Sequence, residues 1–235
     1  IFQLYSEPMQ KMRLAARGHG AIQPPEQHRK RIDTYFDPLP FWYAPFEGEL
    51  EGDADYPMHA ITQRPMAMYH SWGSQNAWLR QIHGHNRLYI NRARALQQGI
   101  ADDDWVWITS RVGQVRAQVK LMEGVNPDTV WTWNAIGKRA GAWGLDKDAP
   151  EATRGFLLNH LIAELLPEQA GGYRYSNSDP VTGQAAWYDL KVRIARATDQ
   201  SIGLTEPRFA PLVNPTGVET PDESRFGAEF TGGAR

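Results

Sequence analysis

The most regular feature of the chain is an alternation of apolar and polar residues, which begins near Met58 and returns near Leu190. Alternation with a period of two predicts β-strands that bury one face. Strands are expected at residues 58–62, 88–90, 105–109, 114–121, 129–133 and 190–195. Gly113 stands between the third and the fourth of these segments, so we expect the two to form a hairpin.

The predicted core follows from the same alternation. Apolar residues at every second position of a strand share one face, and that face is the one a small barrel buries. The residues expected to be buried are Ile90, Val106, Ile108, Val115, Val119, Val130, Val192 and Ile194. Helical spacing of apolar residues predicts short helices at 75–83, 92–98 and 156–165, with Ser74 as the N-cap of the first. The chain is therefore expected to be mainly β, with peripheral helices.

The segments on either side of the barrel have a different pattern. Residues 7–17 have a helical period, but residues 22–57 are rich in proline and aromatic residues and are expected to be irregular. Two interpretations stay open for this arm: a lid over its own domain, or an arm lying on a further domain. We expect an apolar patch at 35–46. The predicted division is an arm at 1–55, a barrel at 56–197 and an extended tail at 198–235.

Composition removes several classes of function. The 25 basic and 27 acidic residues nearly balance, so nothing indicates a nucleic acid or an anionic membrane as a partner. The sequence has no cysteine, which excludes thiolate zinc sites, iron–sulfur ligation and cysteine nucleophiles within these residues. No apolar run approaches the roughly 20 residues of a membrane span. The first residue is Ile, and we interpret the chain as part of a longer polypeptide.

The motifs of common catalytic sites are absent. No GxGxxG, GxxxxGK[ST], HExxH or GxSxG pattern occurs, so nucleotide folds and hydrolase elbows find no support. His83 and His85 are close in sequence but have no carboxylate at ligand spacing, and a solvated loop is the simpler interpretation. We therefore predict neither catalytic residues nor metal ligands in this chain.

Polar residues at the predicted strand ends form the candidate site. Arg and Lys neutralise phosphates, while Asn, Gln and Ser read the edges of a heterocycle, so the mixture suits a large polar ligand carrying both. Each residue alone is more simply a cap or a turn residue, and the prediction depends on the whole set. The set is Thr62, Gln63, Arg64, His70, Ser71, Asn91, Asn134, Lys138, Arg139, Ser176, Asn177, Ser178, Asp179, Thr182 and Gln184.

Several blocks, taken in order, resemble the C-terminal molybdopterin-dinucleotide-binding domain of the DMSO-reductase family. The blocks are residues 61–64, 70–71, 88–95, 99–110, 125–130 and 177–183. The resemblance covers about 56–197 and implies a six-stranded double-psi β-barrel, similar to aspartate decarboxylase. The segments NAIGKRAGAW and RYSNSDPVTGQAAWYDL look most like those of cytoplasmic, membrane-associated members that oxidise sulfite.

The resemblance implies a cofactor, molybdopterin guanine dinucleotide, present as a bis-pterin molybdenum complex (Mo-bis-MGD). By resemblance, the residues that bind it are Thr62, Gln63, Arg64, His70, Ser71, Asn134, Lys138, Asn177 and Gln184. The molybdenum ligand and any iron–sulfur cluster would lie in an N-terminal part that this chain lacks. The implied partners are the remainder of the catalytic subunit, an iron–sulfur electron-transfer subunit and a membrane anchor subunit, with a cytoplasmic location.

The chain departs from the family pattern at four places. Residues 134–138 stand where many members have Gly-Trp-Trp, and the loop after Asn177 is shorter than usual. Asn91 begins a block usually written Asn-Pro-x-x-Ala, and we expect it to cap the following helix and not to bind cofactor. Asp103 stands where glycine is common, which implies local strain if its φ is positive.

Two functions from different classes follow. The first is the cofactor-binding part of a molybdenum oxidoreductase that acts on a small sulfur oxyanion such as sulfite. The second is a free-standing barrel that serves as a binding or interaction module without redox chemistry. The full-length reading frame distinguishes them most directly.

Overall fold

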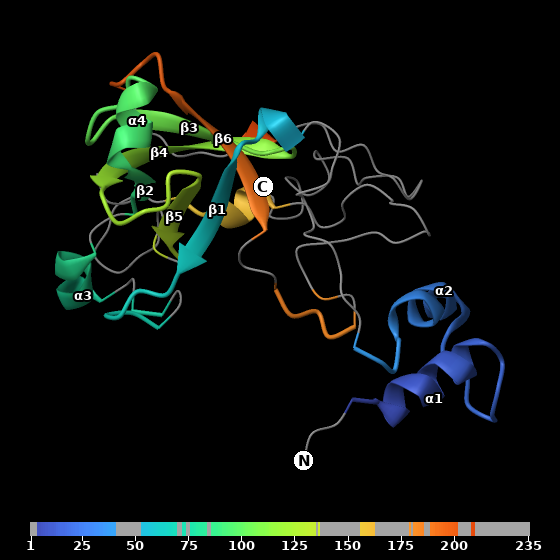
Figure 1. Cartoon of the computed structure of the whole chain (residues 1–235). Coiled ribbons are helices and arrows are strands. Elements are labelled where there is room, and N and C mark those ends of the chain that lie inside the picture. The colour runs from blue at the N-terminus through green and yellow to red at the C-terminus, as the bar shows by residue number, and fades with distance from the viewer. Residues whose placement is uncertain are drawn as a thin grey trace, which may run out of the picture.

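The strands of the protein close into one β-barrel, and two helices, α1 and α2, stand to one side of it (Figure 1). This computed structural model describes residues 4–40, 53–69, 72–73, 76–83, 86–134, 136, 156–162, 179, 181–185, 189–201 and 208–209. The strands are β1 (Met58–Gln63), β2 (Leu88–Asn91), β3 (Trp105–Thr109), β4 (Gly113–Met122), β5 (Thr129–Trp133), β6 (Leu190–Arg196) and β7 (Arg208–Phe209). Within these residues, no helix is long and apolar enough to cross a membrane.

Closure of the barrel comes from a pairing between the two end strands. The order is β2-β5-β1-β6-β3-β4, and β2 pairs in turn with β4, so six strands form a ring; β7 adds to β4. The pairs β1–β5 and β2–β4 are parallel and the others are antiparallel. The predicted six-stranded barrel is confirmed, and its mixed pairing is consistent with a double-psi barrel. A closed ring leaves no long free edge for another strand to pair with.

The interior is built from the residues that the alternation predicted. All eight predicted core residues are buried: seven are fully inaccessible and Ile194 is 7% exposed. In β3, Ile108 stands opposite Val115 of β4 and Ile194 of β6, so the predicted hairpin is confirmed and three predicted core residues lie side by side. Because a shift of one residue would turn every side chain to the other face, this agreement fixes which face is inside.

Two short helices lie near their predicted positions. These are α3 (Ala77–Ile82) and α4 (Arg92–Gln97). Asn91 caps α4 as expected: its Oδ1 accepts from the Arg94 N–H at 3.1 Å, and its Nδ2 donates to the Val125 carbonyl at 2.8 Å. The N-cap of α3 is Asn76 and not Ser74, because the Asn76 Oδ1 accepts from the N–H of Trp78 at 2.9 Å.

The helix predicted at 156–165 is wrong where the structure describes it. Residues 158–161 form a single 3₁₀ turn, η2 (Leu158–Leu161), and its flanking residues Leu157 and Ile162 are extended. Residues 163–165 lie outside the described part of the chain. The apolar spacing has another cause: Leu158 and Leu161, three residues apart, lie on one side of a 3₁₀ turn, and both are buried in the barrel core.

The arm is less irregular than predicted. Besides α1 (Glu7–Ala16), which was expected, it contains α2 (Glu26–Tyr35) and a 3₁₀ turn, η1 (Asp53–Asp55). Neither α1 nor α2 has a buried residue. Arg13 Nη1 contacts Asp37 Oδ2 at 2.9 Å, and Arg17 Nε contacts Asp33 Oδ1 at 2.6 Å, so ion pairs join the two helices. Residues 41–46 of the predicted apolar patch lie outside the described residues.

The acidic turn before β3 contains the strained residue that was anticipated. Asp103 has φ +67°, in the left-handed region that glycine occupies without strain. Its carboxylate pairs with Arg87, and the neighbouring Asp102 accepts from Lys120 Nζ at 2.5 Å. These contacts tie the turn to the strands around it, which offsets the backbone strain.

A pH dependence of stability follows from Asp104, the last residue of this turn. Arg196 donates hydrogen bonds to the Asp104 carboxylate, and its Nε lies 2.7 Å from Asp104 Oδ2. These bonds, together with one from the Ala101 N–H, hold the pKa of Asp104 below its usual value. A lowered pKa adds stability above the unfolded value of about 3.9, and that stability is lost as the pH falls through the folded pKa. We expect Asp104→Asn to be less stable than wild type at neutral pH, with the difference vanishing in acid. Urea unfolding midpoints at both pH values test this; an equal difference at both would contradict it.

Candidate functional site

The candidate site begins at the edge where β1 and β5 end. Because these strands are parallel, their carboxyl ends meet, and Gln63 stands opposite Trp133. The chain continues the pairing one residue further, since the Asn134 N–H donates to the Gln63 carbonyl at 2.7 Å. Gln63 and Arg64 are exposed, and Asn134 is half-buried. Three of the predicted residues are thus brought together on one edge, with half-buried Thr62 just before them.

A buried asparagine that the sequence did not single out, Asn86, stabilises this edge through hydrogen bonds. Asn86 is fully inaccessible; its Nδ2 donates to the carbonyls of Trp133 at 2.9 Å and Phe156 at 3.2 Å. Its Oδ1 accepts from Thr132 Oγ1 at 2.7 Å and from the Arg87 N–H at 3.1 Å. One side chain therefore joins the start of β2, the end of β5 and the 156–162 segment.

Aromatic side chains form one wall beside the same edge. Tyr89 stacks on Trp131 with ring centroids 3.9 Å apart, and the Trp133 ring meets Trp131 edge-on at 4.8 Å. His83, directly after α3, lies 5.5 Å from the Trp133 ring. Burial lowers the pKa of His83, which favours the neutral imidazole. These ring contacts end at Trp133, the residue directly before Asn134.

The structure does not bring Gln184 to this edge. Figure 1 shows the 181–185 turn beside α1 and α2, apart from the end of β1. The Gln184 carbonyl accepts from the Asp179 N–H at 2.7 Å, so the backbone of Gln184 closes a compact turn. His70, Ser71, Lys138 and Asn177 lie outside the described residues, as do Arg139, Ser176 and Ser178.

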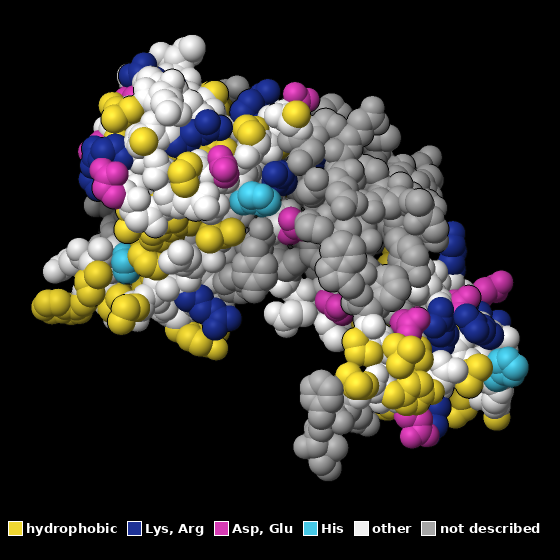
Figure 2. Space-filling view, viewed as in Figure 1, with side chains coloured by type: hydrophobic (Ala, Val, Ile, Leu, Met, Phe, Trp, Pro, Cys, Tyr) yellow, Lys and Arg dark blue, Asp and Glu magenta, His cyan; other side chains and the backbone are white. Residues whose placement is uncertain are grey.

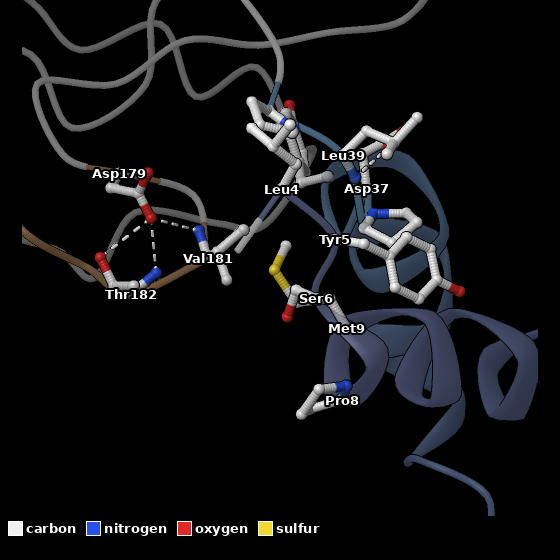
Figure 3. Close-up of a pocket in the computed structure, with 13 residues that line it drawn as sticks. Leu4, Tyr5, Ser6, Pro8, Met9, Asp37, Leu39, Asp179, Val181 and Thr182 are labelled. Carbon is white, nitrogen blue, oxygen red and sulfur yellow. Dashed lines mark hydrogen bonds between the residues drawn. The ribbon is translucent and has the colours of Figure 1, made fainter. Parts of the chain in front are cut away.

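A groove of about 540 Å³ opens between that turn and the N-terminal helices (Figure 3). Tyr5, Met9 and Leu39 line one side, and Asp179 and Val181 the other. Burial alone would raise the pKa of Asp179, but hydrogen bonds from the Thr182 backbone and hydroxyl and from Val181 hold the pKa below its usual value. The Asp179 carboxylate thus stabilises its own turn.

The chemistry of the strand-end edge is that of binding. Arg64 contributes a guanidinium, and Gln63 and Asn134 contribute amides, all from adjacent strand ends. A guanidinium matches the geometry of phosphate oxygens, and amides both donate to and accept from ring edges. The described residues contain no group of three or more His, Cys, Asp or Glu that could hold a metal ion. The arrangement therefore favours a phosphate-bearing heterocyclic ligand.

Residues 58–178, which include both strand ends, match the Molydopterin dinucleotide binding domain family, and the chain belongs to that family. Its class is thereby defined: it carries a domain that binds molybdopterin dinucleotide. Among individual proteins, the chain is 57% identical over 217 residues to a sulfite dehydrogenase subunit of Allochromatium vinosum, covering 92% of this chain and 22% of that protein.

Two further relatives are more distant. Dopamine dehydroxylase of Eggerthella lenta is 28% identical over 196 residues, covering 80% of this chain and 17% of that protein. Dimethyl sulfoxide/trimethylamine N-oxide reductase of Cereibacter sphaeroides is 31% identical over 93 residues, covering 39% of this chain and 11% of that protein. The chain thus spans about a fifth or less of the length of the relatives it matches.

Proposed function

We propose that the chain closes one side of the Mo-bis-MGD cofactor in the catalytic subunit of an enzyme that oxidises a small sulfur oxyanion such as sulfite. One observation carries the choice of substrate class. The chain is 57% identical to the Allochromatium vinosum sulfite dehydrogenase subunit over 92% of the chain, whereas the dopamine dehydroxylase and the dimethyl sulfoxide/trimethylamine N-oxide reductase are 28% and 31% identical. The bound group would supply electron and oxygen-atom transfer, while these residues bind and orient it.

The donor set at the strand ends fits a pterin dinucleotide. Its pyrophosphate needs a cation or directed N–H donors, and the Arg64 guanidinium at this edge is such a cation. Gln63 and Asn134 have the amides that a guanine or pterin edge requires. His70, Ser71, Lys138 and Asn177 complete the proposed set on the family resemblance alone. Thr62 and Gln184 are proposed on resemblance, and the turn role of Gln184 is the simpler one.

The further partners belong to the same proposal. An enzyme of this kind would need the remainder of its catalytic subunit for the molybdenum ligand and for any iron–sulfur cluster. An iron–sulfur subunit would then carry the electrons away, and an anchor subunit would hold the assembly at the cytoplasmic face of a membrane. The absence of cysteine in the sequence is in keeping with cluster ligands placed elsewhere.

We expect Arg64→Ala, made in the full-length polypeptide, to lower cofactor occupancy while the fold survives. Loss of one charge-assisted hydrogen bond in a closed site costs about 1.5–3 kcal/mol, roughly ten- to hundredfold in affinity. Molybdenum and guanine nucleotide content per polypeptide is the measurement, with circular dichroism as the check on folding.

The matched control is Arg92→Ala. Arg92 lies on α4 and makes a surface contact with Glu123 at 2.5 Å, so its loss should leave the cofactor content unchanged. Equal content in Arg64→Ala and Arg92→Ala would mean that this strand end does not hold the cofactor, and the family resemblance would then stand for the fold alone.

A further inference from the structure

The groove between the N-terminal helices and the 181–185 turn has the size of a small-molecule site. Its volume of about 540 Å³ lies within the range of such pockets. Figure 2 shows hydrophobic side chains, with Asp or Glu side chains beside them, gathered over the start of α1, next to the place where Figure 1 puts this turn. Leu39, which lines the groove, is 56% exposed. The groove thus offers apolar surface and carboxylates together.

Hydrogen bonds hold the helix side of the groove in place. The Ser6 N–H donates to the Pro38 carbonyl at 2.7 Å, which joins the start of α1 to the segment after α2. Asp37 Oδ1 accepts from the Leu39 N–H at 3.0 Å, and Asp37 Oδ2 accepts from Arg13 Nη1 at 2.9 Å. The backbone that carries Leu39 is therefore held to α1 by two contacts, and this wall is a built part of the fold.

On the facing side, one oxygen of the Asp179 carboxylate receives no hydrogen bond from its own turn. The three bonds from the Val181 N–H and from the N–H and hydroxyl of Thr182 all end on Oδ1, as the dashed lines of Figure 3 show. Oδ2 can therefore accept from a ligand while the turn stays intact. Burial raises the pKa of Asp179, but these hydrogen bonds and the positive charge of Arg31 on α2 lower it, so the carboxylate is ionised.

The charge of the lining favours a cation. Among the described residues that line the groove, the charged side chains are two carboxylates, Asp37 and Asp179. The hydrogen bond from the Leu39 N–H lowers the pKa of Asp37, so this group is ionised as well. Negative charge repels an anionic ligand and attracts a cationic one. The rings of Tyr5 and Tyr35, also in the lining, favour a cation further.

We propose that the groove binds a small organic cation, whose amidinium, guanidinium or ammonium group donates to Asp179 Oδ2 and whose apolar body packs on Leu39 and Met9. The apolar wall keeps water from one side of the cation, which strengthens its attraction to the carboxylate. The volume of the groove and its hydrogen-bonded walls suit a small molecule. The proposal goes beyond the proposed function and does not depend on it.

A ligand-observed NMR titration of the full-length polypeptide with benzamidine tests the site. Benzamidine carries an amidinium on a phenyl ring, whereas benzamide has the same ring without a charge and benzoate has it with a negative charge. We expect benzamidine to bind, benzamide to bind about tenfold more weakly, and benzoate not to bind.

Three variants and two matched controls locate the binding. Asp179→Asn should weaken benzamidine binding about tenfold, whereas Asp128→Asn, which removes an equal charge from an exposed turn before β5, should not change it. Leu39→Ser should weaken it about threefold, whereas Leu96→Ser on α4, at 57% exposure against 56%, should not. Arg31→Ala should strengthen it about twofold, because a competing cation is removed, whereas a general loosening of the groove would weaken it.

Three results would overturn the proposal. The first is benzamidine that fails to bind, or that binds no better than benzamide. The second is benzamidine binding that Asp179→Asn and Leu39→Ser both leave unchanged, with circular dichroism showing that the variants are folded. The third is tighter binding of a capped peptide with one arginine between two leucines, which would assign the groove to a protein segment instead of a small molecule. Molybdenum content enters none of these results, so a failure here leaves the proposed function untouched.

Discussion

Asn86→Asp is expected to lower the free energy of unfolding of the barrel by about 3–5 kcal/mol, the typical effect of an uncompensated buried charge. Asn86 is fully buried, and its amide nitrogen donates to two carbonyls, those of Trp133 and Phe156. A carboxylate has the same shape but places a negative oxygen against both carbonyl oxygens. The change therefore replaces two hydrogen bonds with two repulsive contacts.

The matched control for this change is Thr132→Val. It removes one donor to Asn86 but leaves the Asn86 oxygen bonded to the Arg87 N–H, so we expect a loss of only about 0.5–1.5 kcal/mol. Chemical denaturation of both variants provides the comparison. Because burial raises the pKa of a carboxyl group, the defect of Asn86→Asp should shrink in acid, where the protonated group can donate again. Two variants of equal stability would show that the network does not hold the end of β5.

Ile108→Ala is expected to cost about 2–5 kcal/mol, as truncations of fully buried aliphatic residues do. Ile108 is inaccessible in the middle of β3, between β4 and β6. Since the barrel is closed, the strands around Ile108 cannot move inward independently to fill the cavity. Ile108→Val should cost about 0.5–1.5 kcal/mol, and exposed Leu96→Ala should stay within about 0.5 kcal/mol. A change below half a kilocalorie for Ile108→Ala would mean that the strand register is wrong.

The strands could be predicted from the sequence because strands bury alternate residues, whereas their closure into a six-stranded barrel was implied by the family resemblance. Val119 stands between Gln118 and Lys120, and Val115 stands between Gln114 and Arg116, so the alternation indicated which residues of this strand face the core. Such a pattern has no equivalent in α2, which has no buried residue. Instead, Arg13 of α1 and Arg17, directly after α1, make ion pairs with Asp37, just after α2, and with Asp33 in α2. The prolines on both sides of α2 and its lack of an apolar stripe favoured an irregular arm. A helix stabilised by surface ion pairs leaves little periodic signal.

The candidate site was predictable in part for a related reason. Gln63, Arg64 and Asn134 follow strands, and strand ends were where ligand groups were sought. Their meeting on one edge depends on the parallel pairing of β1 with β5, which no local pattern encodes. Asn86 was missed because an asparagine in a polar loop resembles a turn residue until the carbonyls of distant residues 133 and 156 reach it. Long-range hydrogen bonds of this kind are a property of the folded chain alone.

We propose that the joined ends of β1 and β5 hold the phosphate end of the dinucleotide. A density map of the full-length, cofactor-loaded protein tests it most directly. We expect a pyrophosphate within hydrogen-bond distance of the Arg64 guanidinium, with an amide of Gln63 or Asn134 on the adjoining ring or phosphate. A dinucleotide seated at the opposite end of the barrel, against the β3–β4 hairpin at Val112 and Gly113, would contradict it.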